Sequence, residues 1–233
     1  MQFIDGDCQI VPGWLETASQ YLATHENAVA VAGRVRERHP EKSVFNRLCD
    51  AEWNQPAGQV DAIGGIAMMR LDKVLAVEGF RETLLAGEEP ELCLRLRREG
   101  GEIWRLETEM ALHDADMTRF FQWWRRSRRA GYAYAEGRAL HGAGPERHYV
   151  AELRRILFWA GLLPVVILAL VLSGGPWVRY ALVLYPLQVL RLVPREGGER
   201  AFFLTLGKFP EMLGVLDYWI TGRCGVAIKR YQK

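Results

Sequence analysis

The sequence predicts an α/β domain that is followed by an α-helical, membrane-associated region. Up to about residue 140, short β-rich segments alternate with helical patterns, which is typical of α/β folds. From residue 156 onward, long apolar stretches replace that alternation. We therefore divide the chain into residues 1–140, a basic linker at 141–155, and a membrane hairpin with interfacial helices at 156–233.

Local patterns predict the first elements of the α/β part. "MQFI" is a short apolar strand, and Pro12 and Gly13 introduce a helix over "WLETASQYLATH", which has an apolar face. The segment 28–37, "AVAVAGRVRE", is rich in valine and predicts a second strand. Ser43 can cap a helix over "VFNRLCDAEWN".

The next elements surround two glycines and a cluster of acids. "DAIGGIAMMR" (61–70) predicts a strand that Gly64 and Gly65 interrupt, followed by a short helix from Asp72. "AGEEPELCLRLRREGG" predicts a helix, with Pro90 at its first position and Gly100 just past its end. "IWRLE" predicts a further strand, and a long helix with aromatic and arginine-rich sides follows over 117–137.

Composition narrows the classes of function. The net charge is +2, so the balance of charges gives no general attraction to nucleic acid, and we expect no nucleic-acid partner. The cysteines are spread without CxxC spacing, which argues against a zinc knuckle or a redox pair. This cysteine usage favours a reducing, cytosolic setting for the soluble part. The four are Cys8, Cys49, Cys93 and Cys224.

A basic stretch precedes the longest apolar run. Between Arg119 and Arg155 there are nine arginines and three acids, and Ile156–Leu172 then holds seventeen residues without a charge. That length is near the lower limit for crossing a bilayer, and a buried core helix is the alternative. The basic flank and the tryptophans at 159 and 177 favour the membrane, with the basic side in the cytoplasm.

A second, weaker apolar run completes the predicted membrane region. Residues 177–193 hold two arginines and a proline, and the C-terminal "RCGVAIKRYQK" is again basic. A hairpin with both ends on the cytoplasmic side fits this pattern. Residues 201–220 mix apolar and charged positions, which suits a pair of helices at the membrane interface.

Two acids directly follow the first predicted strand. Asp5 and Asp7 flank Gly6, and in open α/β sheets ligands collect beyond the carboxyl ends of strands. Two hard oxygen ligands beside a small residue suit Mg²⁺ or Mn²⁺ bridging a diphosphate. The alternative is an ordinary tight turn, in which Asp-Gly is common.

Glu88 and Glu89 form a second acidic site. A neighbouring carboxylate raises the pKa of one of them, which would let a glutamate accept a proton from a hydroxyl near neutral pH. The alternative is structural, because acids at a helix start are stabilised by its free N–H groups and dipole.

The order of these segments resembles the family-2 glycosyltransferases, which transfer sugars from nucleotide-diphospho-sugars. "FIDGDC" resembles their D-x-D metal motif, and "GGIAMMRLDKVLAVEGFRE" resembles a strand and turn beside the sugar pocket. "GEEPELCLRLR" resembles their E-D-x-[DE]-L-x-x-R motif, and "QWWRR" resembles Q-x-x-R-W of membrane-bound polysaccharide synthases. The resemblance covers nearly the whole chain, especially residues 1–137, and implies a partial GT-A (Rossmann-like) sheet with helices.

The resemblance implies a role for each matched residue. Glu89 would be the catalytic base, with a glutamate where the family usually has aspartate, and Arg126 replaces the tryptophan of the last motif. The metal ligands would be Asp5 and Asp7, and the substrate-binding residues Gly64, Gly65, Glu88, His113, Gln122 and Arg125. For His113 the alternative is a structural histidine. For "QWWRR" it is an interfacial helix whose arginines bind lipid phosphates.

The implied function is an inverting transferase at the inner (cytoplasmic) membrane, with its catalytic part facing the cytoplasm. It would use a nucleotide-diphospho-sugar donor, a saccharide or lipid-linked acceptor, and Mg²⁺ or Mn²⁺, in exopolysaccharide or cell-envelope synthesis. The alternative is a non-catalytic, membrane-anchored remnant that acts as a binding protein. Because the family's first strands have no counterpart before "MQFI", we expect an N-terminally truncated chain that shows no transfer by itself.

Overall fold

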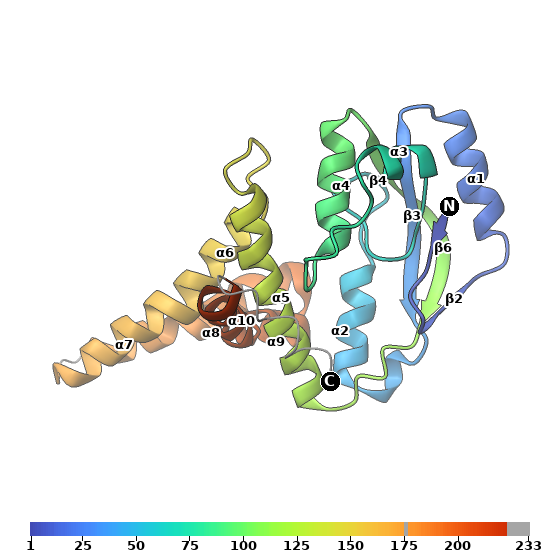
Figure 1. Ribbon diagram of the computed structural model, residues 1–233. Coiled ribbons are helices and arrows are strands. Elements are labelled where there is room, and N and C mark those ends of the chain that lie inside the picture. Colours follow the sequence, from blue (N-terminus) through green and yellow to red (C-terminus); the bar gives the residue numbers. More distant parts are fainter. Residues whose placement is uncertain (175–176, 223–233) are drawn as a thin grey trace. The chain divides into compact units, whose positions relative to one another are not determined.

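The computed structural model describes residues 1–174 and 177–222, and the chain divides into two compact units (Figure 1). The first unit, Met1–Arg119, combines a sheet with helices, and the described part of the second, Phe120–Lys233, is helical. The mixed α/β character of the first unit agrees with the sequence prediction. The boundary between the compact units lies after Arg119, so the long helix that we assigned to the first part belongs to the second unit.

The sheet of the first unit has mixed topology. Its order is β1-β5-β3-β6-β2, with β4 also paired to β6. β3 and β6 are parallel, and every other pairing is antiparallel. β1 lies at one end of this order, so the predicted strand "MQFI" forms an antiparallel edge of the sheet. The strands are β1 (Gln2–Phe3), β2 (Cys8–Ile10), β3 (Ala28–Glu37), β4 (Gly58–Gln59), β5 (Ala67–Met69) and β6 (Glu102–His113).

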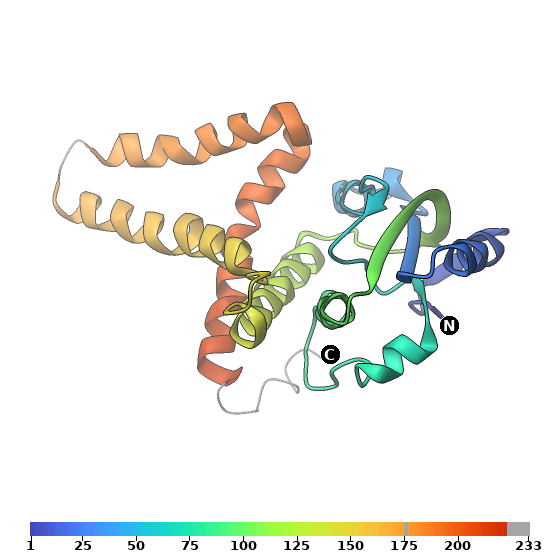
Figure 2. The ribbon, with the colours of Figure 1, turned by 90° about the horizontal axis from the view of Figure 1, so that it is seen from above.

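Helices cover both faces of this sheet. α1 (Trp14–Thr24) and α4 (Glu88–Arg98) lie on opposite sides of β3 and β6 (Figure 2). The run 28–32 at the start of β3 is therefore buried on both faces, as its apolar sequence requires. The remaining helical elements are η1 (Pro40–Lys42), α2 (Val44–Trp53) and α3 (Leu71–Ala76).

The ends of the helices confirm two predicted caps and correct one detail. The Ser43 hydroxyl accepts a hydrogen bond from the Asn46 amide at 3.0 Å and so caps α2. Gly100, with φ +81°, follows the C-terminus of α4 as predicted. Pro90 is the third residue of α4 instead of the first, and it still lies in the turn whose N–H groups have no partner inside the helix.

The core of the first unit joins the sheet to both helices. Trp14 is fully buried, and its indole N–H donates to the side-chain oxygen of Gln2 on β1 at 2.9 Å. This contact ties α1 to the strand that leads into the acidic turn. The buried side chains from α1, β3 and α4 include Trp14, Ala18, Leu22, Val29, Val31, Leu92, Cys93 and Leu96.

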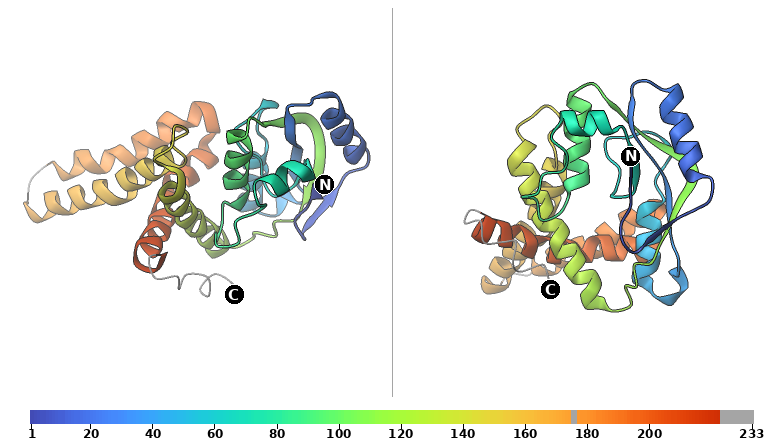
Figure 3. Two further views of the ribbon diagram at one scale, coloured as in Figure 1. Left: turned by 45° about the horizontal axis from the view of Figure 1, so that its top comes forward. Right: turned by 45° about the vertical axis from the view of Figure 1, so that its right-hand side comes forward.

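The second unit consists of helices in its described part. The predicted run Ile156–Leu172 lies within one continuous helical stretch, Val150–Leu172, and 177–193 corresponds to α8. α7 and α8 run side by side in opposite directions (Figure 2 and Figure 3), while "RCGVAIKRYQK" lies outside the described residues. The helices are α5 (Phe120–His141), α6 (Val150–Ile156), the π-helical segment Leu157–Leu162, α7 (Leu163–Leu172), α8 (Val178–Glu196), α9 (Gly198–Leu206) and α10 (Lys208–Thr221).

α5 and α10 cross closely at two glycines. A Cβ at Gly131 would collide with the backbone of Glu211, and one at Gly214 would collide with the carbonyl oxygen of Arg128. Beside the crossing, the Arg128 guanidinium donates two hydrogen bonds to Asp217, at 2.6 and 2.8 Å. The charged residues of segment 201–220 are thus partly explained by pairing within the unit.

Candidate active site

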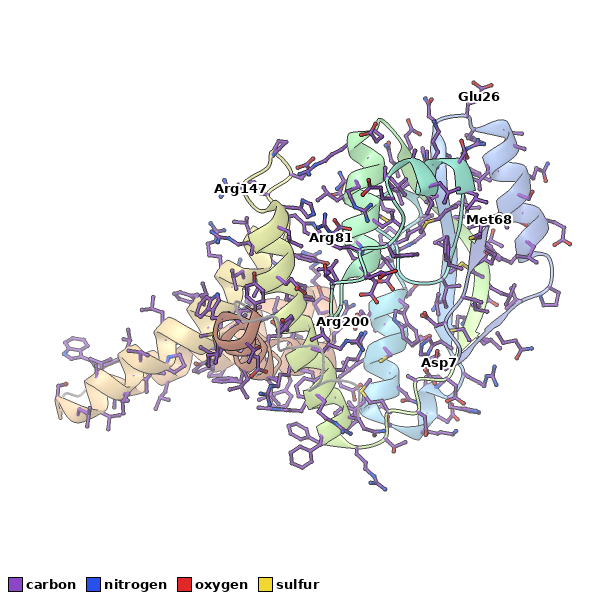
Figure 4. The ribbon with its side chains drawn as sticks, in the orientation of Figure 1. Asp7, Glu26, Met68, Arg81, Arg147 and Arg200 are labelled. Carbon is purple, nitrogen blue, oxygen red and sulfur yellow. The ribbon has the colours of Figure 1, made fainter. Side chains whose placement is uncertain are left out.

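The acidic turn has a defined geometry. The Cys8 amide donates to the Asp5 carbonyl oxygen at 3.1 Å, so Asp5-Gly6-Asp7-Cys8 form a tight turn between β1 and β2. The structural interpretation of Asp-Gly is therefore correct as far as the backbone is concerned. Asp7 lies at the end of the sheet (Figure 4), with 56% of its side chain exposed.

Gly65 lies between the two predicted acidic sites. A Cβ placed on Gly65 would be 2.8 Å from Asp5 Oδ1 and 2.9 Å from Glu89 Oε1. Because both oxygens lie within 2.9 Å of one point, they are at most twice that distance apart. The acidic turn and the start of α4 therefore come close together beside Gly65, where any side chain would meet both carboxylates.

His113, the last residue of β6, joins this group. Its Nε2 lies 3.4 Å from Asp7 Oδ1, and its ring packs against that of Trp53 with 4.5 Å between centroids. Cys8 lies directly opposite His113 in the β2–β6 pairing. The coordinating atoms of Asp5, Cys8 and His113 all lie within 4.8 Å of one another.

Negative charge accumulates around the turn. Partial burial and the neighbouring Asp7 carboxylate raise the pKa of Asp5 above its ordinary value, Glu88 adds to the rise, and His113 opposes it. Burial and the same two aspartates raise the pKa of the Cys8 thiol to about 12. A bound cation would favour the charged forms of Asp5 and Cys8, against both their burial and the repulsion from Asp7.

A buried ion cluster holds the start of α4. Glu91 is 1% exposed, and its carboxylate contacts Arg81 at 3.3 Å and Arg95 at 2.7 Å. Arg95 also donates to the carbonyl oxygens of Val77 and Gly79. Figure 4 shows Arg81 on the loop before α4. The helix that carries the glutamate pair is thus tied to the loop that precedes it.

A second buried network holds the segment after β6. The Glu37 carboxylate, 4% exposed, accepts hydrogen bonds from the Asn46 side chain at 3.2 Å and the Ala115 amide at 3.0 Å. Asn46 in turn accepts from the Met117 amide at 2.9 Å. These bonds fix the chain immediately beyond His113. A shallow pocket of about 380 Å³ opens between the acidic turn and this segment. It is lined by Gly6, Asp7, Cys8, Arg38, Asp114 and Asp116.

The residues present fit a divalent cation. Asp5 and Asp7 supply hard oxygen ligands of the kind that Mg²⁺ and Mn²⁺ prefer, and the pKa of Asp5 is raised by burial and then by the nearby Asp7 carboxylate. Glu88 and Glu89 are the first two residues of α4. They therefore also lie at the positive end of the helix dipole, as the structural alternative expects.

The structure gathers most of the predicted residues. Asp5, Asp7, Gly65, Glu89 and His113 are linked by the distances above, and Glu88 acts electrostatically on Asp5. Gly64 is exposed, and a Cβ there would meet nothing within 4 Å. Gln122 and Arg125 lie in the first turns of α5, in the other compact unit.

Sequence reasoning missed two members of the site, Cys8 and Trp53. Cys8 was set aside for want of a second cysteine nearby, and its pairing with His113 depends on strand register. Trp53 is the last residue of α2 and reaches His113 only through the fold. A scan against protein-family models finds no match to this chain, and a search of the curated proteins finds no relative.

Proposed function

We propose that this protein is a membrane-associated inverting glycosyltransferase of the family-2, GT-A type. The observation that carries the proposal is that the carboxylates of Asp5 and Glu89 both lie within 2.9 Å of the position that a Cβ on Gly65 would occupy. A metal-binding acid and a catalytic base must lie about one sugar apart. The order of the matching motifs along the chain supports the same assignment.

Glu89 is the general base in this proposal. The acceptor hydroxyl oxygen attacks the anomeric carbon and forms a new C–O bond, while the bond from that carbon to the donor diphosphate breaks. The bonding electrons leave with the diphosphate, and the hydroxyl proton passes to Glu89. Attack opposite the leaving group inverts the anomeric configuration, and positioned proton transfer contributes about 10²–10⁴ in rate.

The acidic turn holds the donor. Asp5 and Asp7 would hold a divalent cation, and such an ion would supply positive charge against the charge that develops on the diphosphate leaving group. Gly65 lets the turn and the base come close to each other, because any side chain there would touch both carboxylates. Glu88, His113 and Gly64 border the same donor site in this proposal.

The second unit would place the reaction at the membrane. Within the described residues one helix, Val150–Leu172, is long and apolar enough to cross a bilayer. Its basic flank suits the cytoplasmic side of the inner membrane, where nucleotide-sugars and lipid-linked acceptors meet. We assign Gln122 and Arg125 to binding the diphosphate or the acceptor.

Substitution of the base tests the function. We expect Glu89→Gln, introduced at the chromosomal gene, to lower incorporation of labelled sugar from nucleotide donors into membrane saccharide by about 10²-fold or more, because the amide cannot accept the proton. Glu89→Asp should retain more activity, because it keeps the carboxylate with a shorter reach.

Glu109→Gln is the matched control, since that glutamate is half exposed on β6 and pairs with Arg36. It should leave incorporation unchanged. If Glu89→Gln also leaves incorporation unchanged while the protein is present at its usual level, the non-catalytic alternative is correct and the transferase assignment fails.

A further inference from the structure

The acidic turn lies beside a cysteine–histidine pair, and the proposed function gives neither of these two residues a metal-binding role. Cys8 and His113 are directly opposite each other in the antiparallel pairing of β2 and β6. Such partners project from the same face of a sheet, with Cβ atoms about 4.5–5.5 Å apart. The thiol and the imidazole are therefore neighbours because of backbone register, whatever their rotamers.

The turn adds a carboxylate to this pair. Asp5 and Cys8 are the first and last residues of the turn closed by the 3.1 Å hydrogen bond. A four-residue turn brings its ends together, so the Asp5 side chain returns to the thiol. As a result, one oxygen, one sulfur and one nitrogen lie within 4.8 Å of one another.

The surroundings hold the imidazole in place. Its Nε2 faces Asp7 Oδ1 at 3.4 Å, Trp53 packs against the ring, and the Asp114 amide donates to the Asp7 carbonyl oxygen at 3.1 Å. In the part of the chain that the structure describes, buried Nδ1 of His113 has no hydrogen-bond partner. A histidine that binds a metal commonly shows this arrangement, with a carboxylate at one nitrogen and the other nitrogen left for the ion.

We propose that Asp5, Cys8 and His113 form a binding site for a thiophilic divalent cation of the Zn²⁺ class, which would compete with the Mg²⁺ or Mn²⁺ of the proposed donor site because Asp5 is a ligand in both. Thiolate and imidazole ligands favour Zn²⁺ and Co²⁺, whereas Mg²⁺ requires oxygen ligands in near-octahedral geometry. Three protein ligands are also the number typical of zinc sites that keep one position open. The site stands on this ligand geometry, and its role beside a donor diphosphate rests on the proposed function.

Cobalt substitution gives a direct test with the full chain purified in detergent. Titration with Co²⁺ should produce the near-ultraviolet absorption of a cobalt–thiolate bond, which saturates at one equivalent. Zn²⁺ should abolish the absorption when added in equal amount, and Mg²⁺ in large excess should not. No cobalt–thiolate absorption in the wild-type chain would overturn the site without any variant.

Two variants locate the site. Cys8→Ser should remove the absorption although the other three cysteines remain, and His113→Gln should weaken Co²⁺ binding by about tenfold or more. Circular dichroism of both variants shows whether they fold. A cobalt–thiolate absorption that persists in folded Cys8→Ser would place the metal at another cysteine and contradict the proposal.

The test is independent of sugar transfer. Glu89→Gln should keep the full cobalt–thiolate absorption, because the base is not one of the three ligands. If the transferase proposal fails while the cobalt–thiolate absorption is intact, the metal site still stands. If the cobalt–thiolate absorption is absent while transfer is intact, the metal site is refuted and the transferase proposal stands.

Discussion

At the scale of single residues, Gly65 lies beside both carboxylates on which the proposal depends, those of Asp5 and Glu89. We expect Gly65→Ala to lower transfer by about tenfold to a hundredfold, because its Cβ would lie under 3.0 Å from both Asp5 and Glu89 and push them apart. Incorporation of labelled sugar into membranes, with the protein level quantified, measures the effect.

Gly64 provides the matched control for this substitution. A Cβ on Gly64 meets nothing within 4 Å, so Gly64→Ala should keep wild-type transfer. Equal activity of the two alanine variants would mean that transfer does not depend on the close approach of Asp5 and Glu89 beside Gly65.

The site could be predicted in part because some of its members belong to contiguous motifs. Asp5, Asp7 and Glu89 are identified by their neighbours in the sequence, and the structure brings Asp5 and Glu89 together at Gly65. Cys8 and Trp53 could not be identified in that way. Their proximity to His113 arises from β2–β6 register and from the end of α2, which local sequence does not specify.

At the scale of elements, the buried Glu91 links α4 to the loop before it. Glu91→Gln removes a charge that faces Arg81 and Arg95, and loss of one partner from a buried ion cluster costs about 3 kcal/mol. We expect amide protection in α4 to fall by about a hundredfold in hydrogen–deuterium exchange, since 1.4 kcal/mol corresponds to tenfold.

An exposed ion pair in the same unit is the control. Arg36 and Glu109 lie 2.6 Å apart with about half of each side chain exposed, so Glu109→Gln should change stability by less than about 1 kcal/mol. Unchanged exchange in α4 of Glu91→Gln would show that the cluster does not hold this helix.

Elements with strong local signals were predicted well. β3 has the predicted bounds, 28–37, because its apolar run is buried on both faces. β6 continues to His113, beyond the predicted "IWRLE". The exposed acids Glu107 and Glu109 hide this part of the strand in the sequence. β2 was not predicted at all, since a three-residue strand depends on pairing with β6.

At the scale of the whole molecule, the order of strands and the division into units go beyond sequence periodicity. Alternating patterns predicted an α/β part, but not that β1 would pair antiparallel at an edge. The compact units divide at Arg119, before α5, because α5 packs along α10 at Gly131 and Gly214. That contact joins segments that are far apart in the chain, and no local sequence pattern predicts it.

The last prediction concerns the insertion of the apolar helix Val150–Leu172 into a membrane. Only 11% of the most apolar stretch of the helix Val150–Leu172 is buried within the structure. Its apolar side chains therefore need an apolar environment outside the described protein, such as a bilayer. Val165, near the middle of the uncharged run, is 63% exposed. An arginine near the centre of a spanning helix costs about 2.5–3.5 kcal/mol. Val165→Arg should therefore move much of the protein from carbonate-washed membranes into the soluble fraction.

Leu75→Arg is the matched change in the first unit, because Leu75 on α3 is 65% exposed and lies outside the apolar run. This variant should stay with the membranes as the wild type does, since an exposed arginine on α3 remains in water. Equal fractionation of the two variants would contradict insertion of Val150–Leu172. In that case the apolar surface of the helix would be covered by protein, and the proposed acceptor would have to reach the site from solution.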